Sequence, residues 1–289
     1  NSDVSEDLRI GPEILKQQAE LYRRLRNTLR WLLGSLAGWS DAEALPDAEL
    51  PELERWVLHR LHELDTRVRG ALASDDWTGV YPELHAFCSA DLSAFYFDVR
   101  KDWLYCDAPD SVRRRAVRTV LDRLHRCLVL WLAPVLCFTA EEAWLARFPS
   151  ENGSVHLQLF PDVPAAWFDP ALAARWATLR AARSIVTTAL EAARAAKLIG
   201  ASLQGAVTLP PDMMALAPAE DWAELAIVSS VVPGDALHVH RAPGEKCARC
   251  WRVLPEVNAA ALCLRCVAVI GPDATGPDAT GPGATGPGA

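Results

Sequence analysis

Four cysteines near the end of the chain have the spacing of a metal site. Cys247 and Cys250 form one Cys-x-x-Cys pair, Cys263 and Cys266 form a second, and 12 residues separate the two pairs. Four thiolates suit the tetrahedral coordination of Zn²⁺, and they leave no open position for water or substrate. The spacing therefore predicts one structural zinc ion. Iron in the same four-thiolate site is the chemical alternative.

The residues around these cysteines suggest contact with nucleic acid. Arg249, Arg252 and Arg265 bring positive charge to the segment, and Trp251 brings a flat ring. Cations attract phosphates, and an aromatic ring can stack on an unstacked base. The alternative for Trp251 is that it only packs beneath the metal-binding turn.

Further arginines lie in the segments 21–30 and 111–126, which are expected to be helical. Because the net charge of the chain is −8, any nucleic acid would have to bind a local basic face. The candidates for such a face are Arg23, Arg24, Arg26 and Arg30 in the first segment and Arg113, Arg114, Arg115, Arg118, Arg123 and Arg126 in the second. The alternative is that these arginines are solvated and balanced by nearby acidic residues.

No catalytic constellation accompanies these residues. The sequence has no glycine-rich phosphate loop, no nucleophile elbow and no helix with two histidines at metal spacing. His238 and His240 alternate in an expected strand, which is more typical of a surface pair than of a catalytic one. We therefore predict no catalytic residue in this chain.

Apolar residues at three- and four-residue spacing predict that the first half of the chain is a bundle of four long helices. The expected helices cover residues 14–36, 53–72, 80–105 and 112–133. Ser111 is a candidate N-cap and Pro134 should kink or end the fourth helix. Thr139 and Glu142 have the spacing of a capping box at the start of another helix.

The second half of the chain predicts one long helix, opened by Asp169 and closed by Gly200, followed by short strands. The strands are expected within residues 202–209, 226–232 and 236–241, as a small sheet against that helix. Residues 271–289 repeat a five-residue unit with no apolar side chain larger than proline, so we expect them to be disordered. The predicted fold class is mainly α.

The composition favours a cytoplasmic protein. No stretch has the 18 to 20 apolar residues, roughly, of a membrane span, and the start of the chain does not resemble a signal peptide. Reduced thiols are therefore expected. The four remaining cysteines lie in helical segments, where a lone cysteine is typically a small core residue. They are Cys88, Cys106, Cys127 and Cys137.

Several segments, taken in order, resemble the C-terminal part of bacterial isoleucyl-tRNA synthetases, which are class I enzymes. The resemblance runs from Asn1 to about Val269. The segments are SEDLRIGPEILKQQAELYRRLRNTLRWLLG, DLSAFYFDVRKDWLYCD, LAPVLCFTAEEAW, LEAARAAKLIGASLQGAVTL and the terminal KCARCW with LCLRC.

The resemblance implies three parts: a helical anticodon-binding domain over 1–149, a C-terminal junction over 150–242 and a zinc knuckle over 243–270. The repeat adds a fourth part, a tail over 271–289. The resemblance implies further that the knuckle helps to bind the anticodon arm of isoleucine tRNA. The tRNA-binding residues would be Trp251, Arg249, Arg252, Arg265, Arg23, Arg26 and Arg30.

The resemblance also implies an isoleucine–tRNA ligase as the parent enzyme. Its ATP-binding and editing domains would lie upstream of Asn1, so this chain alone would bind tRNA without catalysing the ligation. The expected partners are isoleucine tRNA and that catalytic domain, with a monomeric state and no membrane contact.

The sequence departs from the family pattern at two points, and two other functions remain as alternatives. The loop between the cysteine pairs is shorter than the family pattern, which puts the geometry of anticodon contact in doubt, and the repeat tail has no counterpart. The chain could instead be a freestanding tRNA-binding module. It could also be a structural protein whose zinc knuckle docks a partner protein.

Overall fold

The structure is a computed structural model that describes residues 10–77 and 79–271. Packing divides the chain into two units that interleave along the sequence. Unit 1 contains the described residues of Asn1–Ser40, Arg60–Asp98 and Thr119–Trp167, and unit 2 contains those of Asp41–His59, Val99–Arg118 and Phe168–Ala289. The domain boundaries drawn from the sequence stay a prediction. The repeat from 272 onward lies outside the described residues.

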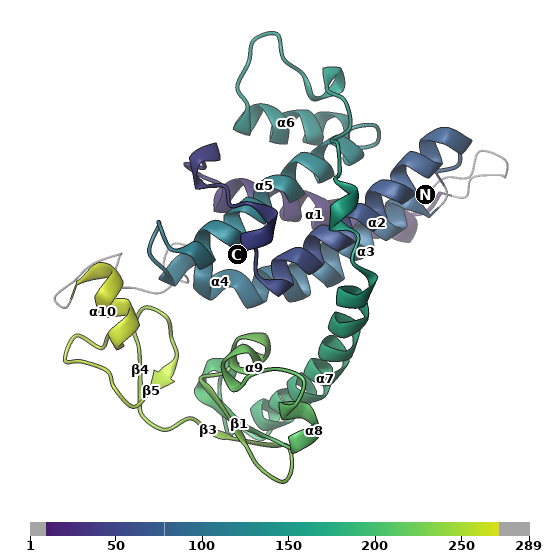
Figure 1. Cartoon of the computed structure of the whole chain (residues 1–289). Helices are drawn as coiled ribbons and strands as arrows, with labels where there is room; N and C mark the ends of the chain where they lie inside the picture. The colour runs from purple at the N-terminus through teal and green to yellow at the C-terminus, as the bar shows by residue number, and fades with distance from the viewer. Residues whose placement is uncertain (1–9, 78, 272–289) are drawn as a thin grey trace. The chain divides into compact units, whose positions relative to one another are not determined.

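The expected helices of the first half are confirmed (Figure 1). In the third of them, a ten-residue π-helical segment separates two α-helices, which the periodicity did not predict. The elements are α1 (Pro12–Ser35), α2 (Glu52–Ser74), α3 (Val80–Ala86), the π segment η3 (Phe87–Tyr96), α4 (Phe97–Cys106), α5 (Val112–Leu132) and α6 (Cys137–Arg147).

The core of unit 1 forms where α1 packs against η3 and α6. Leu29 and Leu32 of α1 are buried, as are Leu92 of η3 and Ala140 of α6. The three leucines belong to the apolar stripes that the sequence spacing predicted, because residues three and four apart share one face of a helix.

Two predicted helix boundaries are confirmed by side-chain caps. The hydroxyl of Ser111 accepts from the backbone N–H of Arg114 at 3.1 Å, at the start of α5. The carboxylate of Asp169 accepts from the backbone N–H of Leu172 at 2.9 Å, at the start of α7 (Pro170–Ala195). At the other end, α5 stops at Leu132, as expected from the proline that follows.

The predicted capping box at Thr139 is wrong. The helix α6 begins at Cys137, so Thr139 already has helical backbone and cannot be an N-cap. Its hydroxyl lies 2.9 Å from that of Tyr22, and Glu142 accepts from the guanidinium of Arg26 at 3.1 Å. These polar side chains therefore join α6 to α1.

The predicted strands form a three-stranded sheet in unit 2, next to the long helix α7. The strands are β1 (Gly205–Leu209), β2 (Ser230–Pro233) and β3 (His238–Arg241), in the order β2-β1-β3. β1 is parallel to β2 and antiparallel to β3. The crossover from β1 to β2 contains two short helices that were not predicted, α8 (Pro211–Met214) and α9 (Ala219–Ala226).

The cysteine segment has its own small elements. β4 (Glu245–Lys246) pairs antiparallel with β5 (Val253–Leu254), and α10 (Leu264–Ile270) follows the loop, in yellow in Figure 1. The scattered cysteines at 88, 106 and 127 are buried as expected, but the expectation is wrong for Cys137, which is exposed. Within the described part of the chain, no helix combines the length and hydropathy needed to cross a membrane.

Candidate metal site and its surroundings

The four cysteines of the two Cys-x-x-Cys pairs converge on one point. Their Sγ atoms all lie within 4.8 Å of one another, and all four residues are buried. A tetrahedron with Zn–S bonds of about 2.3 Å has S–S edges of about 3.8 Å. The distance between the Sγ atoms of Cys250 and Cys263 is 3.8 Å. The donor set therefore fits a tetrahedral zinc ion.

Local hydrogen bonds hold the two pairs in this arrangement. The hairpin closes around Cys247, whose N–H donates to the carbonyl of Arg252 at 2.8 Å and whose carbonyl accepts from Trp251 at 3.0 Å. Cys263 is the N-cap of α10, so Cys266 lies in the first turn of that helix. Each Cys-x-x-Cys pair therefore lies in a short turn, the first in the hairpin and the second at the start of α10.

Without a cation, the sulfur environment keeps the thiols protonated. The neighbouring Cys266 thiol and burial raise the pKa of Cys250 above its ordinary value, and burial raises the pKa of Cys263. A divalent cation supplies the positive charge that lets thiolates persist in such a place, and its binding releases the protons.

Arg249, the second x of the first pair, is buried and points away from solvent. Its guanidinium donates to the carbonyls of Cys106 and, at 3.0 Å, Tyr105, the last two residues of α4. The same guanidinium lies 3.9 Å from the sulfur of Cys266. The predicted role of Arg249 in tRNA contact stays a prediction, and its position is that of an internal link.

Arg265, in the second pair, also contacts α4. It forms a bidentate ion pair with Asp102, at 2.5 and 2.7 Å. Burial alone would lower the pKa of Arg265, but the hydrogen bonds and charge of Asp102 outweigh it and raise that pKa. Arg265 is therefore permanently charged and fixed to α4.

Trp251 and Arg252 lie on the more exposed side of the first pair. Trp251 is half-buried, and its φ of 63° is in the left-handed region. The ammonium of Lys246 lies 5.5 Å from the centre of its ring. Arg252 donates a long hydrogen bond of 3.5 Å to the carbonyl of Val228.

The candidate arginines of the first basic segment lie on α1, in unit 1. Arg23 and its neighbour Arg24 both pair with Glu20, and together they lower the pKa of that carboxyl to about 2. Arg26 pairs with Glu142 of α6. Arg30 is exposed. Surface pairs of this kind contribute little to stability and exchange readily with other anions.

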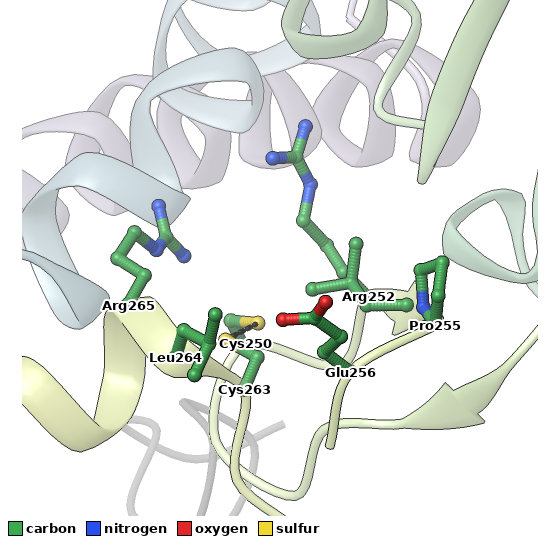
Figure 2. Close-up of a pocket in the computed structure, with 8 residues that line it drawn as sticks. Cys250, Arg252, Pro255, Glu256, Cys263, Leu264 and Arg265 are labelled. Carbon is green, nitrogen blue, oxygen red and sulfur yellow. Dashed lines mark hydrogen bonds between the residues drawn. The ribbon is translucent and has the colours of Figure 1, made fainter.

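A cavity of about 310 Å³ lies beside the sulfurs (Figure 2). Leu254, Pro255 and Leu264 provide its apolar lining, and Glu256 directs its carboxylate toward Cys250. The guanidinium groups of the two lining arginines extend away from the sulfurs, as Figure 2 shows. The cavity offers an apolar wall with one hydrogen-bond acceptor.

Three residues that shape the site were not singled out from the sequence as parts of it. Asp102 and Cys106 lie more than 140 residues before the zinc ligands, and nothing in their local sequence marks them as neighbours. Cys106 packs among the metal-site cysteines. Glu256 lies in the loop between the pairs, where proximity to the cysteines is the only signal.

Comparison with known families places this site in context. Residues 54–209 match the anticodon-binding domain of tRNA ligase, and residues 244–269 match the zinc finger found in FPG and IleRS. The first match covers more than half of the chain, so the chain belongs to the anticodon-binding domain family of tRNA ligases. Together with the sulfur geometry, the zinc-finger match identifies one structural zinc site.

The chain is also similar to isoleucine–tRNA ligases of several bacteria. It is 57% identical over 284 residues to the isoleucine–tRNA ligase of Gluconobacter oxydans (strain 621H), and 47% identical over 293 residues to that of Ruegeria pomeroyi. Each alignment covers 93% of this chain and 30% of the relative. The chain thus spans about 30% of the length of these curated relatives.

Proposed function

We propose that this chain is the anticodon-arm-binding part of an isoleucine–tRNA ligase, which attaches isoleucine to its tRNA with ATP. The observation that carries this proposal is the order of the two family matches, an anticodon-binding domain followed by the zinc finger, in a chain whose relatives are isoleucine–tRNA ligases. The catalytic and editing functions belong to the portion of those relatives that this chain does not match. Isoleucine tRNA and that catalytic portion are the partners.

The proposed domain organisation follows the resemblance up to residue 270. Residues 1–149 are the helical anticodon-binding domain, 150–242 the junction, 243–270 the zinc knuckle and 271–289 a tail. The protein acts in the cytoplasm as a monomer. Size-exclusion chromatography with light scattering would test the monomeric state against the chain mass of 31.6 kDa.

The zinc knuckle is the proposed site of base recognition. A bulky residue at positive φ is strained, and a glycine would adopt this turn more easily. The indole of Trp251 therefore serves some purpose other than the turn, and stacking on an unstacked anticodon base fits a half-exposed ring. The cavity nearby suits a second base, since apolar walls accept its faces and Glu256 can accept from an amino group at its edge.

The arginines supply the sequence-independent part of the affinity. The proposed phosphate contacts are Arg23, Arg26 and Arg30 on α1, and Arg252 within the knuckle. Arg249 and Arg265 act on the tRNA through the position of the knuckle, because their guanidinium groups are engaged with α4. Phosphate contacts release counterions, so the affinity should fall steeply with salt.

A titration of the zinc-loaded chain with isoleucine tRNA tests the proposal. The same tRNA with a substituted anticodon is the matched control, and both are measured at two salt concentrations. A salt-dependent affinity that falls with the anticodon substitution supports anticodon recognition by this chain. Equal binding of both tRNAs would mean that the chain binds tRNA only through a basic surface, without reading the anticodon. No binding of either tRNA would favour a docking role toward another protein.

A further inference from the structure

The side chain of Arg249 connects the metal site to the end of a helix. On one side, its guanidinium donates to the carbonyls of Tyr105 and Cys106. On the other side, it lies 3.9 Å from the Sγ atom of Cys266, one of the zinc ligands. The side chain is buried, so water screens neither contact well.

Both partners of this guanidinium carry negative charge, but only one of them does so permanently. The last carbonyls of a helix have no partner within the helix, and they bear the negative end of its dipole. Zn²⁺ bonded to four thiolates carries a net charge of −2 and holds the sulfur of Cys266 in place beside Arg249, whereas without the metal nothing fixes that sulfur there. The attraction between Arg249 and Cys266 therefore depends on the metal, while that between Arg249 and α4 does not.

Other contacts place the knuckle on the same turn of α4. Arg265 forms its bidentate pair with Asp102, and the side chain of Cys106 packs among the zinc-site cysteines. Asp102, Tyr105 and Cys106 are at positions i, i+3 and i+4, so they share one face of the helix. The knuckle thus has a defined docking surface within unit 2, the last turn of α4.

We propose that zinc binding is energetically coupled, through Arg249, to docking of the knuckle on the last turn of α4. Arg249 is a positioning residue: it neutralises part of the thiolate charge and caps the helix at the same time. Zinc then does more than fold the knuckle, because it also fixes the knuckle, and Trp251 with it, to the helical part of unit 2. A knuckle that docks by packing alone is the competing explanation.

Coupling between two equilibria is reciprocal. If zinc strengthens docking by some factor, docking strengthens zinc binding by the same factor. Typical couplings are roughly 5- to 150-fold, and we expect about tenfold for one shared guanidinium. The proposal therefore predicts the same factor in two independent measurements: the effect of zinc on docking, and the effect of docking on zinc affinity.

The first measurement is hydrogen–deuterium exchange of the full chain, followed at residues 102–106, with zinc and after chelation. In the unmodified protein, chelation should speed exchange of the last turn of α4 about tenfold. In Arg249→Met, which keeps the length and loses the charge, exchange there should be fast already with zinc and should change little on chelation. An unmodified protein whose α4 does not respond to zinc would overturn the proposal.

The second measurement is zinc affinity by competition with a chromophoric chelator. Arg249→Met should bind zinc about tenfold more weakly, and Arg249→Lys should recover part of this loss because it restores charge without the fork. Arg241→Met, which removes an exposed arginine of β3, is the matched control and should bind zinc normally. Normal zinc affinity in Arg249→Met would also contradict the coupling.

Two features keep this test interpretable. Far-UV circular dichroism identifies any variant that fails to fold, and Arg249→Lys then carries the comparison in its place. Full coupling in this variant, which keeps the charge and lacks the guanidinium fork, would contradict the bridging role. No tRNA is present in either measurement. A negative result therefore leaves the proposed tRNA function untouched, and a failure of tRNA binding leaves the coupling untouched.

Discussion

The guanidinium of Arg100 and the carboxylate of Glu54 form a bidentate ion pair that is almost completely removed from water. The two hydrogen bonds are 2.7 and 2.9 Å long, and the side chains are 6% and 0% exposed. Arg100 also reaches Glu224 at 3.2 Å and lies over the ring of Trp103. The pair joins α2 to α4 within unit 2.

Replacing one partner of this pair should be strongly destabilising. In Arg100→Met, the carboxylate of Glu54 stays buried and loses its counter-charge, which costs roughly 3 to 5 kcal/mol of unfolding free energy. The double variant Arg100→Met with Glu54→Leu removes both charges and should recover much of that loss. Urea denaturation measures both.

A matched control is available on the surface of the same unit. Arg175 pairs with Glu52 at 2.6 Å, but the side chains are 47% and 36% exposed. Arg175→Met should therefore change the unfolding free energy by less than about 1 kcal/mol. If Arg100→Met were no more destabilising than this control, the buried pair would not have the role assigned to it.

Features encoded by local spacing were predictable from the sequence. The long helices follow from their apolar stripes, because a core-facing stripe must repeat with the helical period. The starts of α5 and α7 follow from Ser111 and Asp169, whose side chains cap them. The metal site follows from two short turns, each of which brings two sulfurs together whatever the rest of the chain does.

Features that depend on distant partners were not predictable. The pattern at Thr139 and Glu142 suits a cap, yet their side chains bond to residues of α1 that lie about 116 positions earlier in the sequence. Arg249 and Arg265 were predicted to face a ligand, and their internal partners on α4 are likewise remote. The π segment escaped prediction because its buried positions recur every four residues, a spacing that also fits the buried stripe of an α-helix.

Loss of one zinc ligand should release the metal. Cys250→Ser leaves three thiolates, so we expect zinc content to fall well below one ion per chain and the thermal midpoint to become insensitive to chelators. Elemental analysis and melting with and without chelator provide the measurements. Cys137→Ser, which changes an exposed cysteine outside the site, should keep its zinc and its chelator response.

Buried His125 should make unit 1 sensitive to mild acid. Burial, with the nearby charges of Arg147 and Arg126, lowers the pKa of His125 to about 3, whereas the unfolded chain has a histidine pKa of about 6.5. Between these values the unfolded state binds more protons. Stability is therefore fully present above about pH 6.5 and falls as the pH drops toward 3, by up to about 1.4 kcal/mol per pH unit.

His125→Phe removes this titration while keeping an aromatic ring in the core. The slope of unfolding free energy between pH 4 and 6.5 should be shallower in His125→Phe than in the unmodified protein, even if the variant is less stable overall. His156→Phe, at an exposed histidine of the same unit, should keep the original slope. Equal slopes in all three proteins would exclude His125 as the source.

The strained backbone of Trp251 allows its role in tRNA binding to be separated from its role in folding. Trp251→Ala and Trp251→Gly both remove the ring, but only glycine adopts a φ of 63° without strain. We therefore expect the glycine variant to be more stable than the alanine variant by about 1 kcal/mol. Thermal denaturation of the zinc-loaded proteins measures this difference.

Stacking predicts a different order for tRNA affinity. If the ring of Trp251 stacks on a base, both variants lose the same contact, worth roughly 1 to 3 kcal/mol, and Trp251→Phe retains much of it. If Trp251 instead acts only by stabilising the metal-binding turn, tRNA affinity should follow stability and the glycine variant should bind more tightly than the alanine variant. Titration of isoleucine tRNA with the three zinc-loaded variants therefore distinguishes an indole that contacts the ligand from one that only supports the fold.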